Sequence, residues 1–154
     1  MPKITPFLWY NDQAEEAMNY YISIFKNGKV LGVHRANGKV LTVNFELHGQ
    51  RFMGLNGGPL FKFTEAVSLF VDCETQQEVD ELWEKLCADG GEPGRCGWLK
   101  DKFGLSWQII PKALMKLMSD PDPKKSQAVM QAMLKMNKIV IEDLQKAYEG
   151  KAAA

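Results

Sequence analysis

An internal repeat constrains the fold of this chain more than any other feature of its sequence. The strand-like run at residues 68–73 lies over the run at residues 5–10 at an offset of 63 residues (68 − 5). A helical pattern of five apolar or aromatic positions follows each run. These positions are Ala17, Tyr20, Tyr21, Ile24 and Phe25 in the first copy and Val79, Leu82, Trp83, Leu86 and Cys87 in the second. A shared order of elements indicates two copies of one supersecondary module.

Each copy is predicted to continue with three strands. In the first copy, β-rich segments at residues 29–35, 40–47 and 51–55 are separated by turn residues at Asn37-Gly38 and His48-Gly49. In the second copy, a strand region at about residues 95–99 precedes Asp101-Lys102-Phe103-Gly104, which suits a type I turn. A last strand follows at residues 105–110. The sequence therefore predicts two βαβββ modules, at about residues 3–59 and 66–111.

The last quarter of the chain has a helical pattern. A short apolar pattern ends at the Asp-Pro-Asp-Pro segment of residues 120–123, and residues 126–148 have the spacing of one or two amphipathic helices. The methionines gathered here suit either an adaptable binding surface or gap-filling in a core, and we favour the core. We expect an α+β fold with one domain over residues 1–154, in which two modules form cupped mixed sheets and helices at about 112–149 form a C-terminal extension.

Charge and composition exclude several classes of protein. Lys+Arg and Asp+Glu are both 19, so the net charge of +0 gives no positive field that would attract nucleic acid or an anionic membrane. The apolar runs are far shorter than the ~20 residues that a membrane helix needs. The first residues lack the apolar core of a signal peptide, and the three cysteines form no C-x-x-C pair. A cytoplasmic protein with reduced thiols is expected, with neither a nucleic-acid nor a membrane partner.

Three segments resemble a known family. They are Ile-Thr-Pro-Phe-Leu at residues 4–8, Asp-Lys-Phe-Gly-Leu-Ser-Trp-Gln-Ile at 101–109, and Ala-Val-Met-Gln-Ala-Met-Leu-Lys-Met at 128–136. With the two modules, they resemble the PhnB-like branch of the vicinal oxygen chelate superfamily, which contains glyoxalase I, extradiol dioxygenases and bleomycin-resistance proteins. The resemblance extends over about residues 3–147.

Some members of this branch have the name 3-demethylubiquinone 3-methyltransferase, which the sequence does not support. A site for S-adenosylmethionine in a Rossmann-like domain would need a glycine-rich turn from strand to helix. Here Asn56-Gly57-Gly58-Pro59 leads into a segment without a helix signal. We therefore expect no methyl-transfer chemistry.

The resemblance implies that the half-open sheets form a cup, whose metal is held by the first and last strands of each module. The corresponding positions here are Thr5, Met53, Ser68 and Gln108. Two hydroxyls, a thioether and an amide supply none of the charged or imidazole donors that divalent metals need. Gln108 stands where metal-binding relatives usually have Glu. We predict that the cup holds neither a metal nor another cofactor.

Aromatic residues are predicted to line this cup. Side chains alternate along a strand, so Phe7 and Trp9 share one face with Thr5, and the resemblance places that face inside the cup. The candidate ligand-binding residues are Thr5, Phe7, Trp9, Met53, Leu55, Ser68, Phe70 and Gln108. This lining would either bind a planar or hydrophobic molecule or fill the cup with its own side chains. The sequence leaves both interpretations open.

Few titratable residues suggest catalysis. Asp72 shares strand parity with Phe70 and is the best candidate for a general base, although capping of the following helix is the favoured interpretation. Glu46 and His48, with His34 nearby, are interpreted as part of a solvated outer face. Whether the chain is an enzyme stays open.

The leading hypothesis is metal-free binding of a small hydrophobic or aromatic molecule, as in bleomycin-resistance relatives. The alternative is a lyase or isomerase of glyoxalase type. Because superfamily members pair modules within or between chains, and the net charge is zero, we also expect a homodimer.

Overall fold

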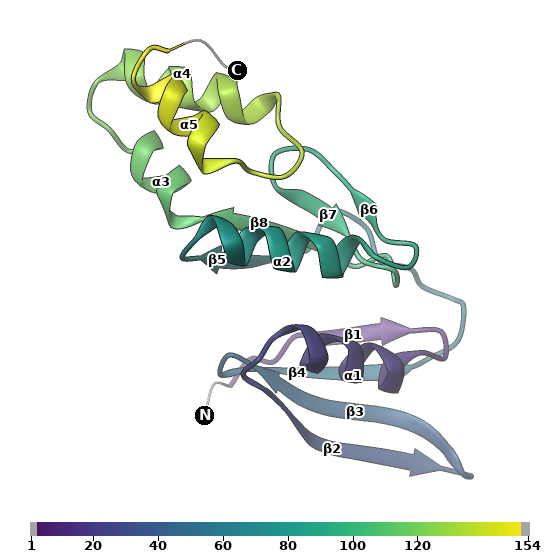
Figure 1. Ribbon diagram of the computed structural model, residues 1–154. Coiled ribbons are helices and arrows are strands. Elements are labelled where there is room, and N and C mark those ends of the chain that lie inside the picture. Colours follow the sequence, from purple (N-terminus) through teal and green to yellow (C-terminus); the bar gives the residue numbers. More distant parts are fainter. Residues whose placement is uncertain (1–2, 152–154) are drawn as a thin grey trace. The chain divides into compact units, whose positions relative to one another are not determined.

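The computed structural model describes residues 3–151, which form two compact units. The first unit ends at Phe63 and the second begins at Thr64. Each unit contains a four-stranded mixed sheet with a helix on one face (Figure 1). The predicted α+β class, with two βαβββ modules and C-terminal helices, is confirmed.

The first unit has one strand, one helix and three further strands. They are β1 (Phe7–Tyr10), α1 (Ala14–Ile24), β2 (Gly28–Ala36), β3 (Lys39–Leu47) and β4 (Gln50–Asn56). The strand order is β1-β4-β3-β2, with β1 parallel to β4 and the other neighbours antiparallel. The chain returns from β1 through α1, so the helix covers one face of the sheet.

Two tight turns fix the register of these strands. Asn37 and Gly38 have φ values of 54° and 77°, and His48 and Gly49 have values of 48° and 81°. Positive φ at both central residues is the requirement of a type I′ hairpin, whose twist matches that of the flanking strands. The second turn pairs Leu47 with Gln50, and this register decides which residues of β3 and β4 share a face.

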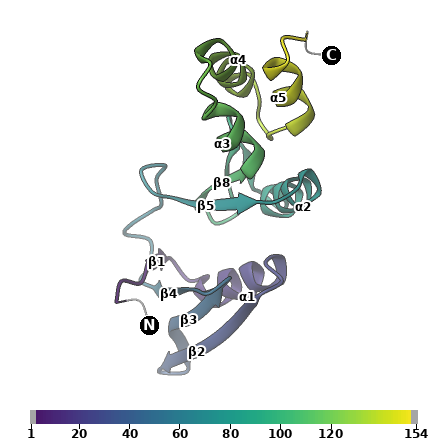
Figure 2. The same ribbon diagram turned by 90° about the vertical axis from the view of Figure 1, so that its left-hand side faces the viewer.

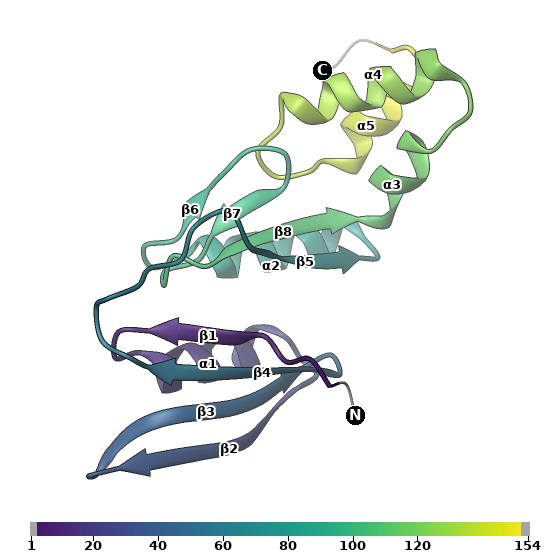
Figure 3. The same cartoon turned by 180° about the vertical axis from the view of Figure 1, so that it is seen from behind.

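Helix α1 buries the alternate residues of the sheet beneath it. Leu8, Tyr10, Val43, Phe45 and Phe52 are buried, as are Ala17 and Tyr21 of the helix. Gly54 allows the close approach, because an added Cβ would lie 2.9 Å from Val43 Cγ2 and 3.6 Å from Ala14 Cβ. Seen from behind, β1 and β4 lie in front of α1, and no other helix of the first unit covers the opposite face of this sheet (Figure 3).

The second unit repeats this arrangement with shorter strands. Its elements are β5 (Ser68–Cys73), α2 (Gln76–Cys87), β6 (Glu92–Pro93), β7 (Trp98–Lys100) and β8 (Ser106–Pro111), in the order β5-β8-β7-β6. The strand expected at residues 95–99 begins at Trp98. Its first residues instead bond to a distant segment: Cys96 N donates to Met136 O and Gly97 N donates to Asn137 O, both at 2.8 Å.

A buried carboxylate shapes the turn between β7 and β8. Asp101 is 2% exposed, and its Oδ1 accepts from Phe103 N at 2.9 Å and from Leu105 N at 3.1 Å. Its Oδ2 accepts from Trp107 Nε1 at 2.8 Å. The predicted turn is confirmed by the bond from Gly104 N to Asp101 O. Asp101 thus holds both the loop and the first half of β8 in place.

Three helices follow β8 and have a small core of their own. They are α3 (Lys112–Met118), α4 (Pro123–Leu134) and α5 (Ile141–Tyr148), gathered together at one end of this unit (Figure 2). The buried residues of this core are Leu114, Val129 and Leu144 of the helices and Ile139 between α4 and α5, which pack with Ile110 of β8.

Part of the methionine pattern contributes to this core, and one glutamine ties the helices to α2. Met118, Met133 and Met136 pack against it, as expected for gap-filling. Gln76 accepts from Ile141 N at 2.7 Å and donates to Ile139 O at 2.9 Å. No helix within residues 3–151 is long and apolar enough to cross a membrane.

Candidate functional site

The face of each sheet opposite its helix is the candidate functional surface. In the first unit, Leu8 and Tyr10 are buried whereas Phe7 is 52% exposed, so the predicted alternation along β1 is confirmed. Strand register adds the other members of this face. We define the first open face as Phe7, Trp9, Thr42, Asn44, Glu46, Arg51, Met53 and Leu55.

These residues form rows across the sheet. Phe7 pairs with Met53, which pairs with Asn44. Trp9 pairs with Leu55 in the next row along the strands. Four of the predicted ligand-binding residues, Phe7, Trp9, Met53 and Leu55, therefore lie together as one apolar group. Thr5 precedes β1 and is half-buried.

Trp9 packs partly on its own chain. Its Nε1 donates to Gly58 O at 3.0 Å, and its ring meets Phe61 edge-on at 4.9 Å between centroids. An added Cβ at Gly57 would lie 2.4 Å from Trp9 Cζ2, so the ring lies directly on that glycine. Trp9 thus fills part of the face itself, whereas Phe7 is 52% exposed.

The other end of the first open face is polar, and sequence reasoning missed it. Glu46 and Arg51 are cross-strand partners, and Glu46 also pairs with Lys29 Nζ at 3.4 Å. Arg51 Nε and Asn44 Oδ1 are buried without a hydrogen-bond partner. The signal was available, since a two-residue turn at His48-Gly49 already requires Glu46 to face Arg51.

The interpretation of Glu46 and His48 as one solvated outer face is right for His48, which is exposed, and wrong for Glu46. Register places Glu46 on the first open face, with its side chain half-buried. His48, in the left-handed turn, instead sets its ring edge-on to Phe25 at 6.0 Å, beside the end of α1. His34 is exposed on β2 opposite Thr42. The three residues form no common ligand set.

The second unit has an equivalent face. We define the second open face as Ser68, Phe70, Trp98, Lys100, Ser106 and Gln108, which share parity through the pairings of β5, β7 and β8. Phe70 is 53% exposed, and Gln108 Nε2 donates to Ser68 Oγ at 2.9 Å. The structure therefore brings together the three residues predicted here, Ser68, Phe70 and Gln108.

A pocket of about 360 Å³ opens beside β7 on this unit. Trp98, Lys100 and Ser106 are among its lining residues, and Lys100 forms an ion pair with Glu65 at its edge. Ser106 is 1% exposed, and its Oγ has no hydrogen-bond partner. Sequence reasoning named neither Trp98 nor Ser106 as a site residue.

The donors at the four projected metal positions do not fit a divalent ion. Ser68 and Gln108 bond to each other through a hydroxyl and an amide N–H, and Thr5 and Met53 add a hydroxyl and a thioether. None of these groups supplies the charge that offsets dehydration of a metal. Within residues 3–151, no group of three or more His, Cys, Asp or Glu side chains could hold an ion.

Asp72, the candidate base, lies at an exposed position. Lys112 Nζ is 3.1 Å from Asp72 Oδ2 and 2.9 Å from Glu74 Oε1, and hydrogen bonds to Glu74 and Asp72 raise the pKa of Lys112. The favoured capping role is wrong, because Thr75 is the N-cap of α2 and accepts from Glu78 N at 3.1 Å. Asp72 thus has a lysine counter-charge and no part in the cap.

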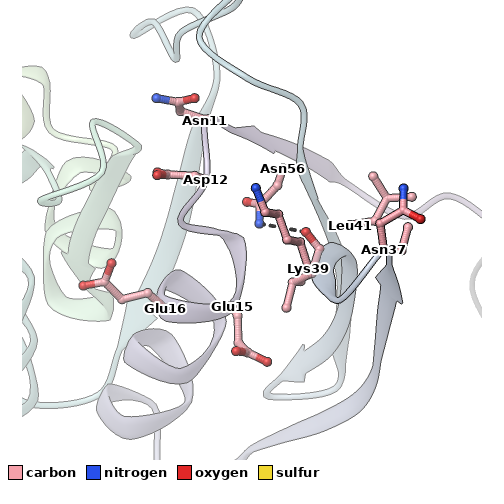
Figure 4. A pocket seen from close by; sticks show the side chains of 10 residues that line it. Asn11, Asp12, Glu15, Glu16, Asn37, Lys39, Leu41 and Asn56 are labelled. Carbon is pink, nitrogen blue, oxygen red and sulfur yellow. Dashed lines mark hydrogen bonds between the residues drawn. The ribbon is translucent and has the colours of Figure 1, made fainter.

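A larger pocket, of about 710 Å³, lies between the start of α1 and the β2–β3 hairpin (Figure 4). Asn56 crosses its floor: the side chain accepts from Ala14 N at 2.8 Å and donates to Val40 O at 3.1 Å, the dashed line in Figure 4. Of its acidic lining residues Asp12, Glu15 and Glu16, Glu15 is paired with Arg35 at 3.2 Å. Asn56 acts here as a structural link between helix and sheet.

The thiols of the buried Cys73 and the partly buried Cys87 are poor nucleophiles. Burial raises the pKa of Cys73 to about 12, and burial also raises the pKa of Cys87. A thiol that stays protonated at neutral pH does not attack substrates. Neither residue is therefore a candidate for covalent catalysis.

Comparison with known proteins identifies the family. A family model described as 3-demethylubiquinone-9 3-methyltransferase matches residues 2–110. A PhnB protein from Bacillus cereus, with the same description, is 36% identical; the match has a TM-score of 0.67 and covers 71% of this chain and 99% of that one. The model match ends before the methionine-rich tail, which was part of the resemblance seen in the sequence. No curated protein shows significant similarity.

More distant structures share the fold. A glyoxylase/bleomycin resistance protein/dioxygenase domain from Frankia sp. EAN1pec is 15% identical, with a TM-score of 0.51 over 72% of this chain and 92% of that chain. The fosfomycin resistance protein FosX from Listeria monocytogenes, solved with Mn(II) and sulfate, is 18% identical, with a TM-score of 0.51 over 70% and 88%. The chain therefore belongs to the PhnB-like family, whose model is described as 3-demethylubiquinone-9 3-methyltransferase, and it shares its fold with structures of the glyoxalase and bleomycin-resistance type.

Proposed function

We propose that this chain binds a small hydrophobic or aromatic molecule on the open faces of its sheets, without a metal. The observation that carries the proposal is the apolar group on the first open face, where Phe7 is more than half exposed beside Met53 and Leu55. Apolar side chains left uncovered on an otherwise well-packed sheet are typical of ligand-binding surfaces. Phe70, beside the bonded pair Ser68 and Gln108, supplies the equivalent group in the second unit.

The methyl transfer in the family's description is not part of this proposal. The segment after β4, residues 57–67, contains no helix, so no helix N-terminus is available there for an anionic or nucleotide cofactor. The lyase or isomerase alternative would need a base, and Asp72 is exposed and paired with Lys112. Binding therefore has more support than either reaction.

The proposal is tested with N-phenyl-1-naphthylamine, a neutral aromatic probe whose fluorescence rises in apolar surroundings. Phe7→Ala is expected to weaken probe binding by ~1–3 kcal/mol, since it removes exposed aromatic contact area. Leu134→Ala, at an exposed apolar position in α4, is the matched control and should leave the affinity unchanged. Absence of saturable binding to the unmodified protein, or equal loss in both variants, would reject the proposal.

Association into a homodimer remains a prediction. Its interface should bury at least the ~1,000 Å² expected of a specific contact. Sedimentation equilibrium at micromolar concentration tests this, and a species of 17.4 kDa would contradict it.

A further inference from the structure

The first open face changes from apolar to charged along its strands. Trp9 and Leu55 form one end, Phe7 and Met53 the middle, and Arg51 the other end. Successive residues on one face of a strand are about 7 Å apart, so Arg51 lies one such step from Met53 and two from Leu55. A bicyclic aromatic ring over Phe7 and Met53 would place a substituent within reach of the guanidinium.

Arg51 has no partner for its charge. Its Nε is buried without a hydrogen bond, and no carboxylate of the described residues forms an ion pair with it. Glu46, the cross-strand neighbour, is paired with Lys29 on its other side, so this row of three charges keeps one net positive charge. A half-buried guanidinium without a partner is costly, and its donors match a carboxylate, sulfonate or phosphate.

Asn44 is a second unsatisfied group on the same face. Its Oδ1 is buried and accepts no hydrogen bond, and the residue pairs with Met53 in the middle row. Among the described residues, three buried side-chain polar atoms lack a partner, and two of them are on this face. Buried polar atoms are nearly always satisfied in folded proteins, by protein, water or a bound molecule, and these two atoms lie beside exposed aromatic surface, where a ligand can reach them.

We infer that the ligand of the first open face is an aromatic or apolar molecule with an anionic group, which pairs with Arg51 while the ring contacts Phe7 and Met53. This inference rests on the proposed function and adds the chemical class of the ligand. Asn44 Oδ1 accepts a hydrogen bond from a hydroxyl or amine of the same molecule. A neutral ring would occupy the apolar rows and leave Arg51 unpaired.

Two fluorescent probes that differ by one anionic group test the inference on the full chain. They are 1-anilinonaphthalene-8-sulfonate and its neutral counterpart N-phenyl-1-naphthylamine. The sulfonate should bind about tenfold more tightly than the neutral probe, the equivalent of ~1.4 kcal/mol. Arg51→Gln should abolish this advantage and change the affinity for the neutral probe less than about twofold.

Arg35→Gln is the charge-matched control, because Arg35 is a cation of the same unit that is already paired with Glu15. It should leave the affinities for both probes unchanged. The salt dependence of the unmodified protein gives a readout that needs no variant: raising ionic strength from about 0.02 M to about 0.5 M should weaken sulfonate binding and spare the neutral probe.

The outcomes separate the two proposals. Saturable binding of the neutral probe, without tighter binding of the sulfonate or without an effect of Arg51→Gln, overturns the anionic ligand and leaves the proposed function standing. Binding of neither probe overturns both. Equal losses of sulfonate affinity in Arg51→Gln and Arg35→Gln would assign the effect to net charge and overturn the inference.

Discussion

Replacing Asp101 with Asn tests whether this carboxylate is the element that organises the β7–β8 turn. The side chain is 2% exposed and accepts from Phe103 N, Leu105 N and Trp107 Nε1. Asn keeps an oxygen for the two backbone donors but turns an N–H toward the indole N–H. If the amide is rotated, its oxygen accepts from the indole N–H, but its NH2 group then faces the two backbone N–H donors.

The magnitude follows from the bond that is lost. A hydrogen bond to a charged acceptor contributes about 1.5–3 kcal/mol, and in the variant the buried indole N–H faces an amide N–H instead of a carboxylate oxygen. We expect Asp101→Asn to lower the free energy of unfolding by ~2–4 kcal/mol. Trp107→Phe removes the donor of the same hydrogen bond. Because each single variant already loses this bond, the loss of unfolding free energy in the double variant should be smaller than the sum of the two single losses by ~1.5–3 kcal/mol.

Urea unfolding followed by circular dichroism and by tryptophan fluorescence measures these differences, provided that the two signals coincide and the slope with denaturant stays constant. Lys102→Gln is the control, because Lys102 lies half-exposed in the same turn and its replacement leaves the Asp101 carboxylate in place. A loss below about 0.5 kcal/mol for Asp101→Asn, or additive effects in the double variant, would refute the role assigned to Asp101.

Two further predictions concern groups on or beside the open faces. Ser106→Ala removes a buried hydroxyl without a partner, so it should leave the free energy of unfolding unchanged or raise it. Ser68→Ala removes the acceptor of the Gln108 hydrogen bond and should lower the free energy of unfolding by ~0.5–1.5 kcal/mol. The reverse order of stability in thermal or urea unfolding would contradict the hydrogen bonding described. Gly57→Ala places a Cβ within 2.4 Å of Trp9 Cζ2, so the ring must move. The indole N–H resonance of Trp9 should shift in NMR spectra while those of the other tryptophans stay in place, and an unchanged Trp9 resonance would show that the ring does not rest on this glycine.

The repeat and the turn residues were enough to predict most of the fold. Asn37-Gly38 and His48-Gly49 adopt the paired positive φ values that their sequence favours, and both hairpins form where expected. The strand expected at residues 95–99 was only partly right. Backbone donors of Cys96 and Gly97 bond to carbonyls of residues 136 and 137, a contact across forty residues of chain that no local pattern reveals.

The part of the candidate site that follows from the alternation of side chains along a strand was predictable from the sequence. Parity along β1 correctly separated Phe7 and Trp9 from the buried Leu8 and Tyr10. It could not show that Trp9 rests on Gly57, because that contact depends on the path of the loop after β4. The unsatisfied state of Arg51 likewise depends on what every neighbouring side chain does.

One of the segments on which the family resemblance was based, residues 101–109, has a mainly structural task. Within residues 101–109, Asp101 fixes the turn, and Trp107 and Ile109 are buried. Between them, Ser106 and Gln108 face the other way, onto the second open face. A match to this segment therefore identifies the scaffold and the direction of two polar side chains.

If the chain binds the proposed ligand, Arg51 is a residue that can select it without a task in the scaffold. Arg51 packs under no helix and caps no turn, and the register set by His48-Gly49 would place any residue at position 51 on the same face. Its half-buried guanidinium without a partner stabilises nothing in the fold that the structure shows. A side chain that is costly to the fold and lies on the first open face is where specificity for the proposed ligand would be encoded. Replacing Arg51 should therefore change which probe binds while leaving the free energy of unfolding unchanged or raised.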